Sequence, residues 1–275
     1  VQLGNGYIKF WGVRGSHPTP DNDKINFGGD TSCVEIRTEN NLFIFDMGSG
    51  LRNFGEEMLK EKSTPKNVHV FLSHYHWDHI VGFLSFKPLF NSSFKFHIYG
   101  YNKNTDINII ADKLLDHTVW PVSIEMLLAE VNFINLKGDT LKINEKISIE
   151  YIEHPHPNGA TSYKFNVGNF SILYTTDCEH KNNILNENVL KISKNANIII
   201  HDSHFMTEDL PAHKGWGHSS WKNAVDLAIE SDIEQLILFH FSPEYNDQTI
   251  IEMEKQAKTH FINTIAAKQG MKITF

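Results

Sequence analysis

The stretch Leu72-Ser73-His74-Tyr75-His76-Trp77-Asp78-His79 packs three histidines and one aspartate into six residues, directly after the apolar run at residues 68–72. Imidazole nitrogens and carboxylate oxygens are the donors that zinc and similar divalent ions favour. A chain that leaves a strand and turns into a loop can aim alternate side chains into one cavity. We therefore expect His74 and His76 to bind one metal ion, while Asp78 and His79 reach a second ion.

The spacing His-x-His-x-Asp-His resembles the signature of the metallo-β-lactamase superfamily, and it is specific enough to disfavour an ordinary polar surface loop. The resemblance implies an α/β fold, namely a four-layer αβ/βα sandwich with a dinuclear metal site at one edge of two facing sheets. It also requires three further metal ligands from later in the chain.

Length and composition are those of an ordinary globular protein. The 275 residues are enough for one large domain that spans residues 1–275, with 40% hydrophobic and 21% charged residues. The apolar runs fall short of the about 18 residues of a membrane helix, and no secretory leader opens the chain. With only Cys33 and Cys178, no disulfide framework is expected. We therefore expect a cytoplasmic protein without membrane contact.

The net charge of −8 argues against a broad electrostatic hold on a nucleic-acid polymer, because such binding relies on clustered lysine and arginine. A small anionic substrate remains compatible with this charge, because bound divalent ions dominate the local field. We therefore expect a small-molecule substrate.

Apolar strands that end in His or Asp recur along the chain. A single polar residue at a strand end is common by chance, but five cases in one chain indicate a site built on loops that a rigid sheet holds. The pattern runs from residues 68–72 to His74, from 147–152 to His154 and His156, from 170–174 to Asp177, from 198–200 to His201 and Asp202, and from 236–239 to His240.

The superfamily resemblance implies how the metal ligands are divided. His154 competes with His156 for one position, and the separation of His156 from Tyr163 resembles relatives in which a ligand histidine precedes a tyrosine on the next strand. Asp46, in Asp46-Met47-Gly48, is interpreted as a brace for the histidine loop rather than as a ligand. The implied ligands are His74, His76 and His156 for the first ion, Asp78, His79 and His240 for the second ion, and Asp177 as the bridge between them.

The remaining histidines lack such a motif. His69 and His97 alternate with apolar residues in strands, and we expect them to be structural. We expect surface or loop positions for His17, His117, His180, His213 and His260.

Two helices are expected in the last third of the chain. Gly215-Trp216-Gly217-His218-Ser219-Ser220 precedes an amphipathic helix that Ser219 or Ser220 caps, so His218 lies at a helix N-terminus. A final helix from about Asp247 is expected to carry on one face the apolar residues Ile250, Met253, Ala257, Phe261 and Ile265.

Several motifs resemble the phosphodiesterase branch of the superfamily, which includes tRNase Z. These are His201-Asp202-Ser203-His204, Gly-His-Ser at residues 217–219 and His-Phe-Ser-Pro at residues 240–243. Residues 10–16, 27–33 and 215–219 look like the bacterial and phage cyclic-nucleotide phosphodiesterases of the anti-Pycsar type. The chain departs from that pattern at Asp30, Ser162 and Lys164, where Asn, Gly and Arg are usual.

This resemblance implies hydrolysis of a nucleoside 3′,5′-cyclic monophosphate, such as cyclic AMP, cyclic GMP or a cyclic pyrimidine nucleotide, to the 5′-monophosphate. It implies two divalent metal ions, with Zn2+ favoured over Mn2+ and Fe2+, and a homodimer. His218, held by Asp202, is the expected general acid for the leaving oxygen. Asp78 is counted among the catalytic residues as well as among the metal ligands.

The main alternative is a tRNase Z-like endoribonuclease or another small phosphodiester hydrolase. Bacterial tRNase Z carries a long Gly- and Lys-rich arm before the bridging aspartate, but here Tyr163 and Asp177 are only 14 residues apart. A flavodiiron-like redox protein is disfavoured because His76 stands where that class has Glu. A metal-binding sensor without catalysis would be expected to have lost ligands, whereas every ligand position is occupied.

Overall fold

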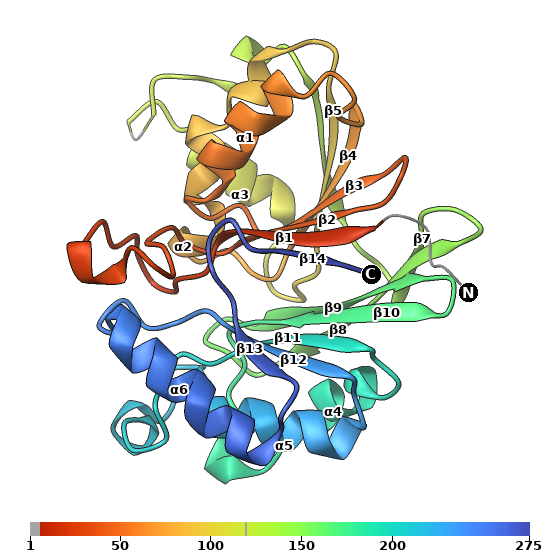
Figure 1. Cartoon of the computed structure of the whole chain (residues 1–275). Coiled ribbons are helices and arrows are strands. Elements are labelled where there is room, and N and C mark those ends of the chain that lie inside the picture. Colours follow the sequence, from red (N-terminus) through yellow and green to blue (C-terminus); the bar gives the residue numbers. More distant parts are fainter. Residues whose placement is uncertain (1–5, 119) are drawn as a thin grey trace.

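The computed structural model describes residues 6–118 and 120–275, and in these ranges two mixed β-sheets face each other (Figure 1). The first sheet has the strand order β14 (Lys272–Thr274), β1 (Tyr7–Gly12), β2 (Cys33–Arg37), β3 (Leu42–Phe45), β4 (Asn67–Leu72), β5 (Lys95–Gly100) and β6 (Glu130–Asn135). The second sheet has the strand order β13 (Thr264–Ala266), β12 (Gln235–Phe239), β11 (Ile198–Asp202), β10 (Phe170–Thr175), β9 (Ala160–Val167), β8 (Ile147–His154) and β7 (Thr140–Lys142).

Helices cover the outer faces of both sheets (Figure 1). The first sheet is covered by α1 (Leu51–Lys60) and α3 (Ile107–Leu114), and the second sheet by α4 (Glu187–Ser193), α5 (Trp221–Ser231) and α6 (Asp247–His260). The single turn α2 (Trp77–Ile80) follows β4. The predicted four-layer αβ/βα sandwich is confirmed, and the assignment of residues 1–275 to one domain stays a prediction.

Aromatic side chains fill the space between the sheets. Alternation along β3 sends Phe43 and Phe45 inward, while Ile44 points outward into the apolar cluster that includes α1. Phe43 packs against Phe165 of the opposite sheet with ring centroids 4.9 Å apart, and Phe45 lies 5.5 Å from Tyr174. These large buried rings hold the two sheets in a defined relation to each other.

The strands that lead to the predicted site residues end at one edge of the molecule. β3 and β4 run parallel in the first sheet, and β10, β11 and β12 run parallel in the second sheet. Because parallel strands bring their carboxyl ends together, their loops form one continuous site. The residues at or just beyond these ends are Asp46, His74, Asp177, Asp202 and His240.

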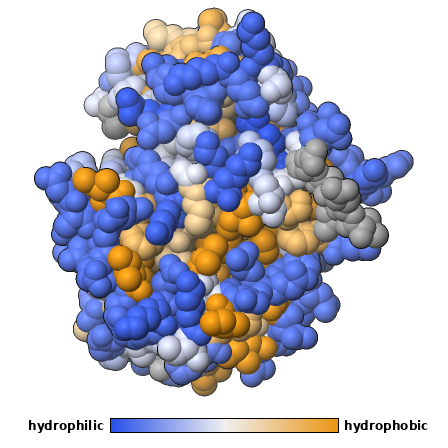
Figure 2. Space-filling view, viewed as in Figure 1, coloured by the Kyte–Doolittle hydropathy of each residue, from blue (hydrophilic) through white to orange (hydrophobic). Residues whose placement is uncertain are grey.

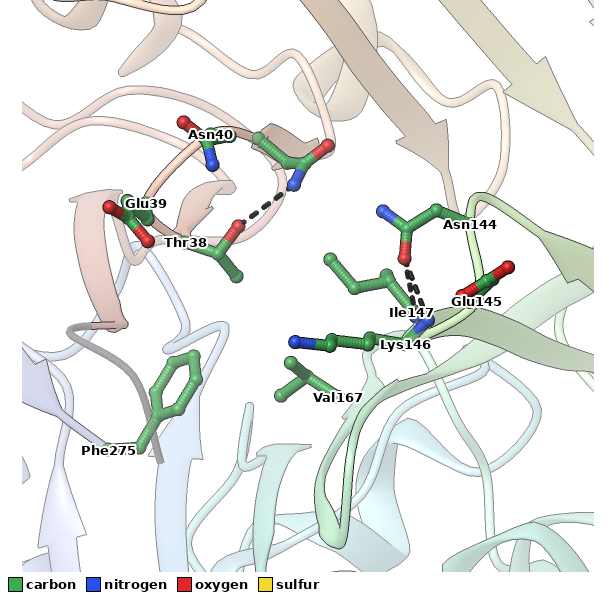
Figure 3. A pocket seen from close by; sticks show the side chains of 10 residues that line it. Thr38, Glu39, Asn40, Asn144, Glu145, Lys146, Ile147, Val167 and Phe275 are labelled. Carbon is green, nitrogen blue, oxygen red and sulfur yellow. Dashed lines mark hydrogen bonds between the residues drawn. The ribbon is translucent and has the colours of Figure 1, made fainter. Parts of the chain in front are cut away.

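The opposite edge of the sandwich holds a separate cavity of about 520 Å³. Figure 3 shows Thr38 and Phe275 on one side of this cavity and Lys146 and Val167 on the other side. Its lining residues within the described ranges include no histidine. We therefore place the metal chemistry at the other edge, where the parallel strands end.

The surface of the protein is mainly polar on the face that Figure 2 shows. Hydrophobic residues gather near the centre of that face, where β13 and β14 form sheet edges, and hydrophilic residues predominate over the helical layers. Within the described part of the chain, no helix is both long enough and apolar enough to cross a membrane.

The helix that follows His218 begins as the sequence predicts. Ser220 is the N-cap of α5, and its backbone and hydroxyl form a capping box with Asn223. This contact identifies Ser220, rather than Ser219, as the capping residue.

The predicted extent of the last helix is wrong at its C-terminal end. α6 ends at His260, because Phe261 adopts an extended backbone with φ −139° and ψ 100°. Ile265 belongs instead to β13, where it pairs with Ile237 of β12. A parallel edge strand therefore replaces the last helical turn that the apolar spacing predicts.

Candidate metal centre and active site

The structure brings all seven predicted metal ligands together at the carboxyl ends of the parallel strands. They come from four separate segments, so the fold brings donors that are distant in the sequence into contact. The loop after β4 and the turn α2 contribute His74, His76, Asp78 and His79, the β8–β9 turn contributes His156, and the ends of β10 and β12 are followed by Asp177 and His240.

The first group of donors surrounds one oxygen of Asp177. Nδ1 of His76 lies 3.1 Å from Nε2 of His156. Oδ1 of Asp177 lies 3.8 Å from Nε2 of His74 and 3.7 Å from Nε2 of His156. The three histidines expected at the first ion therefore converge with a single carboxylate oxygen.

The second group surrounds the other oxygen of Asp177. Nε2 of His79 lies 3.2 Å from Nε2 of His240, 3.2 Å from Oδ2 of Asp78 and 3.1 Å from Oδ2 of Asp177. Nε2 of His240 lies 3.2 Å from the same oxygen of Asp177. Because Oδ1 faces the first group and Oδ2 faces the second group, Asp177 has the geometry of a bridging ligand.

The histidine rings are held in the tautomer that suits a metal site. Nδ1 of His156 donates a hydrogen bond to the carbonyl oxygen of Gly217 at 2.9 Å, which leaves Nε2 with a free lone pair. Nε2 of His74 is buried and has no hydrogen-bond partner within the described residues. Buried lone pairs that converge without donors are unfavourable unless a cation lies between them, so these residues fit a metal ion.

The pKa values of these rings reflect burial and the neighbouring carboxylates. Burial lowers the pKa of His156 to about 4, so its ring is neutral at pH 7 and can act as a ligand. Burial also opposes charge on His79, but the carboxylates of Asp78, Asp177 and Asp46 outweigh it and raise the pKa of His79 well above its usual value. The second group thus attracts positive charge strongly.

The fully buried carboxylate of Asp46 orients the histidine loop from behind. Its Oδ1 accepts a hydrogen bond from the backbone N–H of Ser73 at 2.7 Å, and its Oδ2 accepts from the Ser73 hydroxyl at 2.8 Å, the Tyr174 hydroxyl at 2.7 Å and Nδ1 of His79 at 2.8 Å. Because the Ser73 hydroxyl donates to Asp46, its oxygen can accept from Nδ1 of His74, 3.1 Å away. These contacts support the interpretation of Asp46 as a brace.

Three residues of the site adopt a left-handed backbone that side chains other than glycine rarely take. Asp46, Asp177 and His240 have φ angles of 62°, 53° and 61°. Such conformations cost on the order of 1–3 kcal/mol each and are retained where the surroundings demand them. Asp46 and His240 follow directly after a parallel strand and Asp177 follows one residue later, so the unusual φ turns the chain sharply at the site.

His218 and Asp202 form the pair that the sequence predicts. Nδ1 of His218 lies 3.0 Å from Oδ2 of Asp202 and 3.7 Å from Oδ1 of Asp177, so the pair lies beside the metal ligands. Burial opposes charge on both groups, but their attraction lowers the pKa of Asp202 to about 2 and raises the pKa of His218. The other oxygen of Asp202 accepts hydrogen bonds from the backbone N–H groups of His204 and Ser219.

Glu179, which was not among the predicted site residues, holds the loop before His218. Its two carboxylate oxygens accept hydrogen bonds from the backbone N–H groups of Gly215 at 2.8 Å and Gly217 at 3.1 Å. Gly217 has a φ of 88°, and a Cβ atom there would lie 2.0 Å from Nδ1 of His156. Glu179 therefore fixes the loop that orients His156, and the Gly-x-Gly spacing around Trp216 was the only local signal of it.

The side chain of Asp78 is also fixed from a distant segment. The backbone N–H of Ser16 donates a hydrogen bond to Oδ2 of Asp78 at 2.7 Å, and the hydroxyl of Thr31 donates to the carbonyl oxygen of Asp78 at 2.7 Å. Nothing in the sequence spacing connects these residues. The N-terminal loops thus form part of the wall behind the second group of donors.

His180 lies in a loop, in agreement with the predicted surface or loop position, but this loop position is buried. His180 is 3% exposed, and its Nε2 faces Nε2 of His201 at 3.2 Å. The backbone N–H of Asn186 donates to Nδ1 of His180, and Nδ1 of His201 donates to the carbonyl oxygen of Asp202. The proton on Nε2 of His180 therefore points at a lone pair of His201, which is a neutral hydrogen bond and not a second metal site.

His154 and His156 differ in their surroundings. The ring of His154 is 2% exposed, and neither of its nitrogens has a hydrogen-bond partner within the described residues. Burial lowers the pKa of His154 to about 3, so the ring is neutral. Only His156 has its Nε2 directly beside Nδ1 of His76, and these contacts favour His156 as the ligand.

Two facing sheets with metal-binding side chains at the ends of their parallel strands define a class of metal-dependent hydrolases. A family model described as "Beta-lactamase superfamily domain" matches residues 43–241, which is well over half of the chain. The chain therefore belongs to the beta-lactamase superfamily. The predictions of this superfamily, of its phosphodiesterase and tRNase Z-like branch and of a metal-dependent hydrolase are confirmed.

Individual relatives match along almost the whole chain. Ribonuclease Z of Picrophilus torridus is 23% identical, and the match covers 96% of this chain and 94% of that protein. The metallo-beta-lactamase fold protein YhfI from Bacillus subtilis has a TM-score of 0.75 at 19% identity, with coverage of 99% of this chain and 100% of that chain. Unliganded yeast PDE1 has a TM-score of 0.70 at 14% identity, with coverage of 99% and 100%.

Replacement of Asp46 by Asn should lower the affinity for metal about 10- to 100-fold, because the amide cannot accept the hydrogen bonds of His79, Tyr174 and Ser73 together. The measurement is the metal retained after dialysis against graded concentrations of chelator. Asp226→Asn on the half-exposed side of α5 is the matched control and should behave as the wild type. Unchanged metal retention in a correctly folded Asp46→Asn variant would contradict the bracing role.

Elemental analysis of protein purified without chelator should find about two metal ions per chain, because seven donors are too many for one tetrahedral ion. His156→Ala should lose metal from the first group, while His154→Ala, at a position without a metal-facing contact, should lose less. The opposite order would assign the ligand role to His154. A single ion that added metal cannot raise to two would exclude the dinuclear arrangement.

Proposed function

We propose that this protein is a dinuclear metal-dependent phosphodiesterase that hydrolyses nucleoside 3′,5′-cyclic monophosphates to 5′-monophosphates. The observation that carries the proposal is the division of seven donors into two groups around the two oxygens of Asp177, with the His218–Asp202 pair 3.7 Å from one of them. Two divalent ions, when bound at such a site, activate water at neutral pH and neutralise charge on a phosphoryl group.

The residues of the chain supply the proton that the leaving oxygen needs. Asp202 holds Nδ1 of His218, so that Nε2 of the same ring can carry a proton toward the substrate. The raised pKa of His218 favours the protonated ring near neutral pH, despite the opposing effect of burial. Asp78 joins the site from the other side, where its contact with Ser16 fixes its orientation.

The short loop between β9 and β10 favours a small substrate over a tRNA. β9 ends at Val167 and β10 begins at Phe170, so only a two-residue turn separates them. This is the segment in which a bacterial tRNase Z is expected to carry its tRNA-binding arm. The net charge of −8 also opposes the binding of an RNA backbone.

A tRNase Z-like endoribonuclease is the second candidate function. The observation that favours it is the match to relatives named Ribonuclease Z over 96% of this chain. The same metal and His218 chemistry would serve a linear phosphodiester, so the two candidates differ in what the surface around the site can hold.

The remaining parts of the proposal concern metal, assembly and location. Imidazole and carboxylate donors suit Zn2+ and also accept Mn2+ or Fe2+, so we propose Zn2+ as the first metal to test. A homodimer and a cytoplasmic location also remain proposals.

The metal-loaded protein should hydrolyse at least one cyclic mononucleotide and should not cut precursor tRNA at a comparable enzyme concentration. Products of a panel that also contains cyclic dinucleotides are identified by chromatography. An Asp177→Asn preparation is the control for contaminating activity, because it removes the charge that both groups of donors share. Efficient tRNA cleavage together with inert cyclic nucleotides would favour the endoribonuclease instead.

His218→Ala should slow cyclic-nucleotide hydrolysis by roughly 10²- to 10⁴-fold, the usual effect of losing a general acid, and should leave metal content unchanged. Asp202→Asn should slow it less, because it removes only the orienting charge. The defect should shrink for a 4-nitrophenyl phosphodiester, whose leaving group departs without a proton. His117→Ala, on an exposed loop, is the matched control.

An equal defect of His218→Ala on both substrates would show that His218 positions the phosphate and does not act as the acid. Loss of metal in this variant would place His218 among the ligands.

A further inference from the structure

A cavity of about 670 Å³ adjoins the metal centre on the outer side of the β8–β9 turn. Pro155, His156 and Pro157 of that turn form one wall. The other walls are formed by Glu179, Lys181, Asn182, residues 184–187, Lys214 and Gly215. This volume lies within the range of cavities that bind small organic molecules. Nothing in the chemistry described so far makes use of it.

His156 connects this cavity to the metal centre. His156 belongs to the cavity lining, but its side chain is only 2% exposed: Nε2 faces His76 at 3.1 Å, and Nδ1 donates to the carbonyl oxygen of Gly217. A phosphoryl group held at the first group of donors therefore lies one imidazole ring away from the cavity.

The walls of the cavity match a flat ring system with polar edges. Pro155, Pro157, Ile184 and Leu185 supply apolar surface, and Ile184 is 71% exposed although it is a large hydrophobic residue. Apolar surface of this kind favours contact with the faces of a ligand ring. Lys181, Asn182 and Lys214 add hydrogen-bonding groups, and Nζ of Lys214 donates to Oδ1 of Asn182 at 2.8 Å.

The cavity is also held in shape before any ligand binds. Glu179 fixes Gly215 and Gly217 through their backbone N–H groups, as described above. On the opposite wall, the side chain of Asn186 accepts from the backbone N–H groups of Asn188 and Val189 at the start of α4. Preformed walls reduce the entropy lost when a ligand binds.

We propose that this cavity, called here the His156 cavity, binds the nucleobase of a nucleotide whose phosphate lies at the metal centre. The inference rests on the proposed function, because it assigns the base of that substrate to a place. The apolar walls contact the faces of the base, and the lysine and asparagine side chains contact its edge. Specificity for a base therefore arises in Lys181, Asn182, Ile184, Leu185 and Lys214, away from the metal ligands.

Binding to the metal-loaded protein tests the inference separately from catalysis. The probes are the four common nucleoside 5′-monophosphates and ribose 5-phosphate, which has the same phosphate and sugar but no base, and affinities are measured by calorimetry. At least one nucleotide should bind about tenfold more tightly than ribose 5-phosphate, the size expected for apolar contact with one base. Equal affinity for ribose 5-phosphate and all four nucleotides would overturn the inference.

Ile184→Asp locates the contact. The affinity ratio between the preferred nucleotide and ribose 5-phosphate should fall toward one in this variant, because a charged group replaces the apolar wall. Ile262→Asp is the matched control, since Ile262 is 77% exposed and is not among the residues that line the cavity, and it should keep the wild-type ratio. An unchanged ratio in Ile184→Asp, or an equal loss in both variants, would place the base elsewhere.

These experiments distinguish a failure of the cavity assignment from a failure of the proposed function. If the protein binds nucleotides with this preference but hydrolyses no cyclic mononucleotide, the assignment of the His156 cavity is supported and the proposed reaction is contradicted. If the protein hydrolyses cyclic mononucleotides but binds no nucleotide more tightly than ribose 5-phosphate, the proposed reaction is supported and the cavity assignment is contradicted.

Discussion

The carboxylate of Asp46 joins the two halves of the site through hydrogen bonds that cross the sandwich. It lies at the end of β3, holds the loop after β4 through Ser73, and accepts the hydroxyl of Tyr174 from the opposite sheet. A buried carboxylate is tolerated only when its oxygens are fully hydrogen-bonded, so these partners and Asp46 depend on one another. Through Ser73 and His79 it also decides which ring nitrogens face the metal positions.

The rigidity of the two sheets makes this arrangement possible. Aromatic rings between the sheets, such as Phe45 against Tyr174, set the distance between the strand ends that carry the donors. The left-handed backbone at Asp177 and His240 then turns each side chain toward the centre. The energy of these strained residues is offset by the packing around them, and a bound cation would further stabilise the converging lone pairs.

The loops outside the sheets determine what the site can accept. The short β9–β10 turn leaves little chain for an RNA-binding arm, whereas the segment from Glu179 to Glu187 forms a preformed cavity beside His156. Because Glu179 follows Asp177 by two residues, one stretch of chain contributes both to the metal centre and to the wall of that cavity. If the His156 cavity binds the base as proposed, substrate selection and metal binding share this stretch of chain, although different side chains serve them.

The amino-acid sequence by itself predicted the strand-end pattern and the division of His74 to His79 between two positions, and it narrowed the cap of α5 to Ser219 or Ser220. These features depend on local periodicity and on neighbouring side chains. The sequence could not decide between His154 and His156, because the contact that orients His156 comes from Gly217, 61 residues away in the chain. The burial of His180 and the edge strand at Ile265 likewise depend on partners from other segments. The direction of a side chain in a turn follows from the backbone angles and from what packs against it, and only the tertiary structure supplies both.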